Sequence, residues 1–242
     1  MGAVAIVNGR IFCEEGFAEN DLLIEDGRVL RWAERGHLDA GPEAQTIDAA
    51  GCIVSPGLVD VHFHGAVGAD LCDAAPDALA ARYEARRGIT AICPATMSYS
   101  EEILDGVLAN AAAFAPAEDQ SALVGINMEG PYISPHKVGA QNPIYVRPGT
   151  VAEFNRLQEK AHGLIKIVDV APEVPGALDL IAELSPSVRV SLAHTEATYE
   201  EAQAAFRAGA LQVTHLFNAM PPLHHRDPGI IGAAADCPHA MA

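Results

Sequence analysis

The amino-acid sequence predicts an α/β protein in which a small β module, residues 1–56, is followed by a parallel sheet or a (β/α) barrel, residues 57–242. The first region holds short apolar runs separated by turn signals, and it has no helical period. From residue 57 onward, short apolar runs alternate with segments of helical spacing, which is the pattern of repeated β-α units. Half of the 242 residues are apolar, so the chain can bury a large core.

Two hairpins are expected in the β module. Asn8-Gly9 favours a tight turn and would join two short strands within residues 4–12. Residues 25–27 form a second turn signal and would join two strands within residues 22–30. The module is therefore expected to consist of strands without helices.

Six apolar runs of the second region are expected to form buried parallel strands. They are residues 58–63, 89–93, 123–128, 165–170, 188–193 and 211–216. Ser98, Thr150 and Thr198 each stand three residues before a Glu, a capping-box pattern that predicts the start of a helix, and Gly209 predicts the end of the last one. A closed barrel needs about eight strands, so a barrel would be incomplete within these residues.

Charge and composition disfavour several classes of binding partner. Asp and Glu number 32 against 15 Lys and Arg, which gives a formal net charge of −17 and disfavours binding to nucleic acid or to an anionic membrane surface. No apolar stretch is long enough to span a bilayer, and no basic residues precede the apolar start as they would in a signal peptide. Scattered cysteines without close pairs indicate reduced thiols and a cytoplasmic protein. They are Cys13, Cys52, Cys72, Cys93 and Cys237.

His62 and His64 stand at the end of the first expected barrel strand. Side chains alternate along a strand, so the two imidazoles would share one face and could hold one divalent metal ion. The alternative is a pair of hydrogen-bonded core histidines. Barrel enzymes place their sites at the carboxyl ends of strands, which favours the metal. Asp60, in phase with His62, is either a partner of these histidines or a buried structural acid.

Glu129, His194 and His215 each end an apolar run. A buried carboxylate is costly unless it is paired or bound to a metal, although a Glu at this place could instead cap a turn. A single His on an apolar face is usually a core residue, but two at equivalent strand ends favour a shared function. Together the three side chains would give one ion three N/O ligands and leave open positions, as in catalytic sites for Zn²⁺ or a similar ion.

Two loops follow these strands and could face the same opening. Arg226 stands beside two histidines in an acidic chain and could bind an anion, because a guanidinium matches phosphate geometry. The alternative is a solvated Arg, the commoner state of any single arginine. The loop of residues 135–143 follows the Glu129 strand and contains Ala140 and Gln141.

At these residues the sequence resembles the amidohydrolase superfamily and, within it, the N-acetylglucosamine-6-phosphate deacetylases. The matching segments are residues 56–65, 128–132, 193–195, 214–220 and 226–229. The resemblance implies an incomplete metal-dependent (β/α)8 TIM barrel, with about six strands present, and a small N-terminal β-sandwich module. A lysine at a strand end, typical of dihydroorotase-like relatives, is not evident, because Lys166 lies near the start of its strand.

The resemblance also implies roles for single residues. Glu129, His194 and His215 match the primary metal ligands, and His62 and His64 match positions that hold a second ion in members that keep them. One or two ions, most simply Zn²⁺, are therefore expected. Substrate-binding positions match Ala140, Gln141, Asn218, Ala219 and Arg226. The general acid/base Asp of the family has no counterpart up to Ala242, so the catalytic acid/base is expected beyond this residue in a longer chain.

The implied activity is metal-dependent hydrolysis of the acetamide of N-acetyl-D-glucosamine 6-phosphate, which yields D-glucosamine 6-phosphate and acetate in amino-sugar catabolism. The implied partner is a small phosphosugar, and the full-length protein is expected to form a homodimer. Two alternatives stay open. The chain could be an inactive metal-binding fragment that lacks the acid/base Asp, or another amidohydrolase that acts on a cyclic amide.

Overall fold

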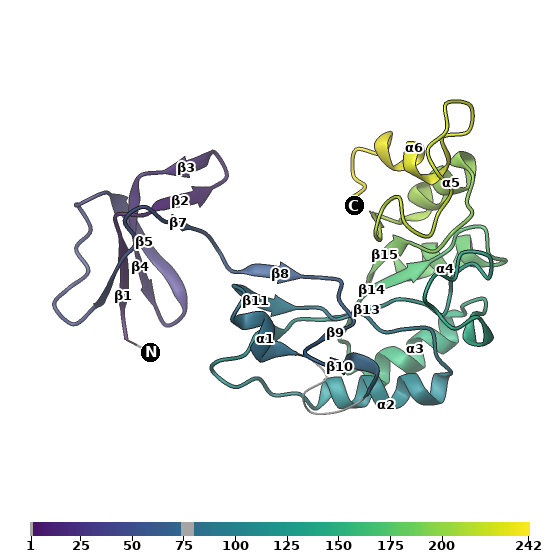
Figure 1. Ribbon diagram of the computed structural model, residues 1–242, viewed down its shortest axis with the longest axis horizontal. Coiled ribbons are helices and arrows are strands. Elements are labelled where there is room, and N and C mark those ends of the chain that lie inside the picture. The colour runs from purple at the N-terminus through teal and green to yellow at the C-terminus, as the bar shows by residue number, and fades with distance from the viewer. Residues whose placement is uncertain (1, 74–79) are drawn as a thin grey trace. The chain divides into compact units, whose positions relative to one another are not determined.

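The computed structural model describes residues 2–73 and 80–242 (Figure 1). The chain divides into two compact units, Met1–Gly57 and Leu58–Ala242. None of the described helices is both long enough and apolar enough to cross a membrane. All five cysteines are free thiols.

The first unit is built from two small sheets. Their strands are β1 (Val4–Val7), β2 (Arg10–Cys13), β3 (Gly16–Ala18), β4 (Asn20–Glu25), β5 (Arg28–Glu34), β6 (Gln45–Asp48) and β7 (Ile53–Val54). One sheet has the order β5-β4-β1-β6 and the other the order β3-β2-β7. The β4–β5 hairpin confirms the turn predicted at residues 25–27, since Glu25 pairs with Arg28 across it.

The hairpin predicted at Asn8-Gly9 is wrong. Strand β1 pairs with β4 on one edge and with β6 on the other, so no edge is left for β2. The chain instead crosses to the other sheet at Asn8, which has a positive φ of 65°. The Asn8 backbone N–H donates to Asp21 Oδ1 at 2.9 Å, and its side chain donates to Asp48 Oδ1 at 2.9 Å. Tertiary pairing therefore overrides the local turn signal.

Parallel strands form the centre of the second unit. They are β8 (Leu58–Asp60), β11 (Ile89–Ile92), β12 (Ala122–Leu123), β13 (Ile126–Met128), β14 (Ile165–Val170), β15 (Arg189–Leu192) and β16 (Gln212–Val213), beside a short antiparallel pair, β9 (Gly65–Ala66) and β10 (Ala69–Asp70). Two sheets have the orders β12-β11-β8 and β13-β14-β15-β16. A parallel bridge between Ala95 and Asn127 links them, so the strands follow one another in chain order.

The third predicted strand, residues 123–128, is interrupted. The Val124 N–H donates to Ile92 O, whereas the Ile126 N–H donates to Leu164 O, so the ladder changes partner at Gly125. A Cβ on Gly125 would lie 2.5 Å from Lys166 Cγ, and the absence of a side chain allows this close approach. Because of this break, the residues before Gly125 form β12 and pair with β11, and the residues after it form β13 and pair with β14.

Helices cover the outer side of the parallel strands (Figure 1). They are η1 (Leu71–Asp73), α1 (Ala81–Ala85), α2 (Glu101–Ala112), η2 (Pro143–Tyr145), α3 (Val151–Lys160), α4 (Ala177–Leu184), α5 (Tyr199–Ala208) and α6 (Gly229–Ala235). Apolar residues of α2, α3, α4 and α5 pack with the strands in one buried core. This core fixes the strand ends that carry the candidate site.

The helix starts partly follow the predicted caps. Thr198 and Glu201 form a full capping box before α5, which ends at Gly209 with a φ of 119°, as predicted. Thr150 caps α3 as predicted, accepting a bond from the Glu153 N–H. The cap predicted at Ser98 is wrong, because α2 starts two residues later and Ser100 accepts the bond from the Ile103 N–H.

Candidate metal centre

Imidazole and carboxylate side chains gather beyond the carboxyl ends of four parallel strands. His62 and His64 follow β8, Glu129 follows β13, His194 follows β15 and His215 follows β16. Parallel strands that neighbour one another end at a common edge, so residues far apart in sequence come together there. The structure thus joins all five residues that the sequence predicted as metal ligands.

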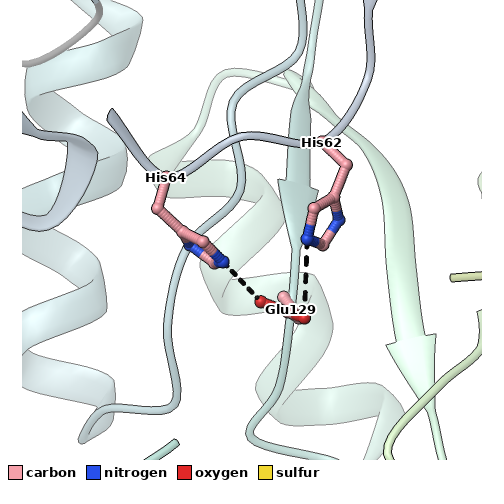
Figure 2. Close-up of side chains that lie close together, drawn as sticks. All are labelled: His62, His64 and Glu129. Carbon is pink, nitrogen blue, oxygen red and sulfur yellow. Dashed lines mark ion pairs between the residues drawn. The ribbon is translucent and has the colours of Figure 1, made fainter. Parts of the chain in front are cut away.

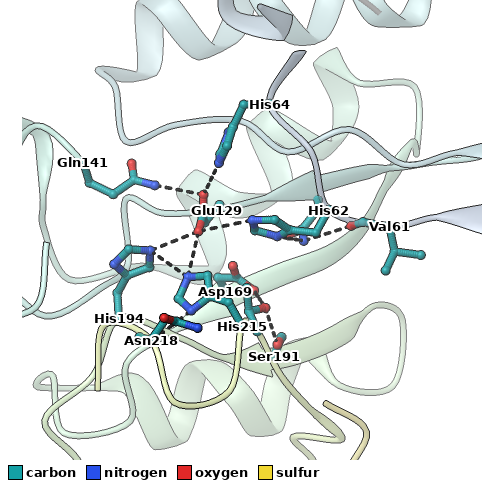
Figure 3. A network of polar contacts seen from close by, with 12 residues as sticks. Val61, His62, His64, Glu129, Gln141, Asp169, Ser191, His194, His215 and Asn218 are labelled. Carbon is teal, nitrogen blue, oxygen red and sulfur yellow. Dashed lines mark hydrogen bonds and ion pairs between the residues drawn. The ribbon is translucent and has the colours of Figure 1, made fainter. Parts of the chain in front are cut away.

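The Glu129 carboxylate is the centre of this group, and its side chain points between the histidines (Figures 2 and 3). Oε1 lies 3.0 Å from His194 Nε2 and 3.2 Å from His215 Nε2. Oε2 lies 3.0 Å from His64 Nε2, while His62 Nε2 is 3.6 Å from Oε1. Glu129 is only 2% exposed, so its negative charge depends on these neighbours.

Among the described residues, two overlapping sets could hold a metal ion: Glu129 with His194 and His215, and Glu129 with His62 and His64. In the first set the two Nε2 atoms are 3.2 Å apart, and each lies 3.0 or 3.2 Å from Glu129 Oε1. Ligands at about 2.0–2.1 Å from a tetrahedral Zn²⁺ are separated by about 3.3 Å. The first set therefore has the spacing that such an ion requires.

The hydrogen bonds behind this first set support the same interpretation. His194 Nδ1 lies 2.8 Å from Lys137 O, and His215 Nδ1 lies 3.1 Å from Asn218 O. A carbonyl oxygen can only accept, so each Nδ1 carries the hydrogen and, in neutral imidazole, each Nε2 presents its lone pair to the centre. Backbone carbonyls behind metal-binding histidines fix the ring in this way in many metalloproteins.

The two histidines do not lie on regular strands, in contrast to the prediction. Strand β15 ends at Leu192 and β16 at Val213, two residues before each His. His194 and His215 have positive φ angles of 45° and 37°, which are uncommon for non-glycine residues. The chain therefore turns where the apolar runs predicted that the strands would end in a histidine, and this turn directs both rings toward Glu129.

Electrostatics keep Glu129 ionised. Burial by itself would raise the pKa of its carboxyl, but the close contacts of its oxygens with His194, His215 and His64 outweigh burial and hold that pKa well below its usual value. The bond to Glu129 raises the pKa of His64, whereas burial lowers the pKa of His62. One carboxylate therefore lies among four imidazoles, in groups that could hold a metal ion.

The loop of residues 135–143 closes one side of the centre, as its place in the sequence suggested. Gln141 is buried, and its Nε2 donates to Glu129 Oε2 at 3.0 Å. A Cβ on Gly139 would lie 3.2 Å from His194 Cε1, so this glycine, at a φ of 56°, lets the loop approach the ring. Ala140, between the two, is exposed.

The predicted substrate residues that follow β16 divide into two groups. Asn218 and Ala219 lie beside the centre, since Asn218 O accepts from His215 Nδ1 and Ala219 O accepts from the Thr195 N–H at 3.1 Å. Arg226 lies farther along the same loop and is exposed, with its backbone N–H donating to His224 Nδ1 at 3.3 Å. The structure therefore brings Asn218 and Ala219 to the ligands and does not give Arg226 a contact with them.

Two polar residues near the centre were not predicted. Asp169 of β14 is fully buried and accepts from Thr214 Oγ1 at 2.8 Å, beside Ser191 (Figure 3). Burial and the charge of Glu129 raise the pKa of Asp169 to about 8. Asn127 of β13 places its amide nitrogen 3.2 Å from His62 Nδ1. The sequence does contain a signal for both residues, because each is a polar residue inside an otherwise apolar run.

Asp60, for which two roles were open, contacts the backbone of the histidine segment. Its Oδ1 accepts from the His62 N–H at 3.0 Å, and the residue is half-buried. Asp60 therefore shapes the chain where it leaves β8.

Residues 53–241 match the sequence pattern of the Amidohydrolase family. The chain belongs to this family. Its parallel strands and surrounding helices form the α/β fold of a metal-dependent hydrolase, and the His and Glu side chains that could hold a metal lie at the strand ends.

The similar proteins are named as deacetylases of N-acetylated amino-sugar 6-phosphates. N-acetylglucosamine-6-phosphate deacetylase of Bacillus subtilis (strain 168) is 39% identical over 240 residues, which cover 96% of this chain and 59% of that protein. N-acetylgalactosamine-6-phosphate deacetylase of Escherichia coli O157:H7 is 34% identical, with coverage of 93% and 59%. A variant of N-acetyl-D-glucosamine-6-phosphate deacetylase from Mycobacterium smegmatis, in complex with N-acetyl-D-glucosamine-6-phosphate, superimposes with a TM-score of 0.87 at 28% identity. That match covers 99% of this chain and 62% of the solved one, so this chain spans less than two thirds of each of these relatives.

Proposed function

We propose that the protein containing this chain hydrolyses the acetamide of N-acetyl-D-glucosamine 6-phosphate to D-glucosamine 6-phosphate and acetate. The observation that carries the proposal is the convergence of Glu129, His194 and His215 at three strand ends, within the family to which the chain belongs. The names of the similar proteins support the substrate class, a phosphorylated N-acetyl amino sugar.

Glu129, His194 and His215 would hold one divalent ion, and His62 and His64 would hold a second with Glu129 as a shared ligand. Zn²⁺ suits a set of imidazole and carboxylate ligands without thiolates. When bound, such an ion lowers the pKa of water and polarises a carbonyl group. The lone pairs of His194 and His215 already face the centre, which fits this assignment.

The remaining residues would bind and orient the sugar. Asn218 and Ala219 lie beside the ligands, and Ala140 and Gln141 lie on the loop that contacts Glu129 and His194. Arg226 is the side chain that would take the phosphate, because its guanidinium can donate two parallel bonds to phosphate oxygens. An exposed Arg can reach a ligand that enters from solvent, which the Arg226 environment allows.

The proton transfers require a group that these five ligands do not supply, since all of them face the ion. In the full-length protein an Asp beyond Ala242 would serve as the general acid/base. In that protein, residues 57–242 and a longer C-terminal segment would complete a (β/α)8 barrel, with residues 1–56 in a β-sandwich module. We further propose that it is a cytoplasmic homodimer that binds neither nucleic acid nor membranes.

Acetate release tests the proposal. A full-length protein that contains this chain is expected to release acetate from N-acetylglucosamine 6-phosphate in the presence of Zn²⁺, and Glu129→Gln is expected to abolish release. N-acetylgalactosamine 6-phosphate is the second substrate to measure, because one similar protein is named for it. Hydrolysis of a cyclic amide without acetate release would contradict the proposal.

A further inference from the structure

His62 is held differently from His194 and His215. Its Nδ1 lies 3.2 Å from Asn127 Nδ2, whereas the Nδ1 atoms of His194 and His215 lie against carbonyl oxygens. The group behind His62 is therefore the side-chain amide of Asn127.

The orientation of this amide follows from a second contact. Asn127 Nδ2 donates to Val61 O at 3.2 Å, and a carbonyl oxygen can only accept. Turning the amide over would place Asn127 Oδ1 against Val61 O, acceptor against acceptor. Asn127 is fully buried, so no solvent would compensate for that loss. The NH₂ group must therefore face both Val61 O and His62 Nδ1.

An NH₂ group can only donate, so His62 Nδ1 must accept. In neutral imidazole the hydrogen is then on Nε2, the atom that points to Glu129 Oε1 at 3.6 Å. A ligand nitrogen needs a free lone pair, and Nε2 of His62 lacks one in this tautomer. The opposite holds for His194 and His215, whose hydrogens are on Nδ1.

We propose that Asn127 weakens a second metal site, so that the chain binds one divalent ion tightly through Glu129, His194 and His215 and another more weakly through His62, His64 and Glu129. This inference rests on the metal centre of the proposed function. Groups behind metal-binding histidines change metal affinity by about ten- to a hundredfold. The second ion is accordingly expected to bind at least about tenfold more weakly than the first.

Calorimetric titration of the metal-free chain with Zn²⁺, together with metal analysis after dialysis, measures this difference. Two binding steps separated by at least about tenfold, with close to one ion retained after dialysis, support the proposal. Two ions of equal affinity, or no binding at all, overturn it. Unequal binding without acetate release by the full-length protein would contradict the proposed activity and leave this inference standing.

Asn127→Asp tests the residue itself. A carboxylate oxygen can accept from His62 Nδ1, so the variant is expected to bind the second Zn²⁺ ion about tenfold more tightly than the wild type. The matched control is Thr96→Val, because Thr96 is also buried, its backbone N–H donates to Asn127 O, and its hydroxyl has no partner among the described residues. The control is expected to keep the wild-type difference. An Asn127→Asp variant that folds and also keeps this difference overturns the proposal.

The wild-type protein provides a measurement that does not depend on a folded variant. Nitrogen-15 NMR of the metal-free chain distinguishes protonated from unprotonated imidazole nitrogens. His62 is expected to show an unprotonated Nδ1, while His194 and His215 show protonated Nδ1 atoms. A protonated Nδ1 and an unprotonated Nε2 in His62 would overturn the proposal.

Discussion

Gln141 connects the Glu129 carboxylate to the backbone of a neighbouring segment. Its Nε2 donates to Glu129 Oε2 at 3.0 Å, and its Oε1 accepts from the Ser98 N–H at 2.5 Å. The second bond fixes the amide, because only an oxygen can accept from an N–H group. Gln141 therefore holds one carboxylate oxygen of the candidate metal centre in a defined direction.

We predict that Gln141→Leu lowers the affinity for the first Zn²⁺ ion by about ten- to a hundredfold, because Glu129 loses a donor that orients it. Calorimetric titration of the metal-free variant measures the change. Gln120→Leu is the control, since Gln120 accepts from the Ala117 N–H in the turn that precedes β12. Equal affinities in wild type and Gln141→Leu would exclude an orienting role.

Arg226→Ala tests phosphate binding in the full-length protein. The exposed guanidinium is expected to bind the phosphate only, so KM should rise about tenfold or more for N-acetylglucosamine 6-phosphate and stay unchanged for N-acetylglucosamine, a loss of about 1.4 kcal/mol or more. Steady-state kinetics with both sugars provide the measurement. Arg207→Ala, an exposed arginine of α5, should change neither value. An equal rise in KM for both sugars would refute the assignment of Arg226.

The sequence predicted the candidate centre better than it predicted the strands that position it. Glu129, His194 and His215 could be found because each ends an apolar run, and burial of a polar group at such a place is costly. The positive φ angles of His194 and His215 could not be found, since they depend on contacts with Lys137 O and Asn218 O. The predicted strands at residues 188–193 and 211–216 extend past the observed ends, Leu192 and Val213, because the apolar pattern does not report these contacts.

The two turn signals of the β module illustrate a second limit. A hairpin forms at residues 25–27, as the turn signal there predicted. No hairpin forms at Asn8-Gly9, although this pair is the stronger hairpin signal. Short-range sequence cannot report that β1 is already paired on both edges. In the same way, Ser98 carries the spacing of a helix cap, but its N–H is used by Gln141 and the helix begins later.

The capping box of α5 predicts a measurable contribution to stability. Thr198 Oγ1 accepts from the Glu201 N–H at 3.2 Å, and Glu201 Oε2 accepts from the Thr198 N–H at 2.8 Å. Thr198→Ala is expected to lower the free energy of unfolding by about 1 kcal/mol, because a backbone N–H at the helix start loses its acceptor. Thr198→Ser keeps a hydroxyl and should cost less than half as much. Urea unfolding of both variants gives the comparison, and equal losses would argue against the cap.

Asp169 predicts a dependence of stability on pH. Burial first, and the charge of Glu129 second, raise the pKa of Asp169 from 3.8 to about 8, against the lowering effects of Thr214, His215 and Ser191. An acid whose pKa is raised on folding binds its proton more tightly in the folded state. Its contribution is therefore fully present below pH 3.8, declines as the pH rises toward about 8, and is constant above that value.

Asp169→Asn removes this titration and keeps an oxygen that can accept from Thr214 Oγ1, as Asp169 Oδ1 does. The free energy of unfolding of the variant, relative to wild type, is expected to increase between pH 4 and pH 8 by up to about 1.4 kcal/mol per pH unit. Urea unfolding of both proteins at several pH values measures this difference without metal. A difference that does not change with pH would mean that Asp169 stays ionised in the folded protein, and the bond from Thr214 would then outweigh its burial.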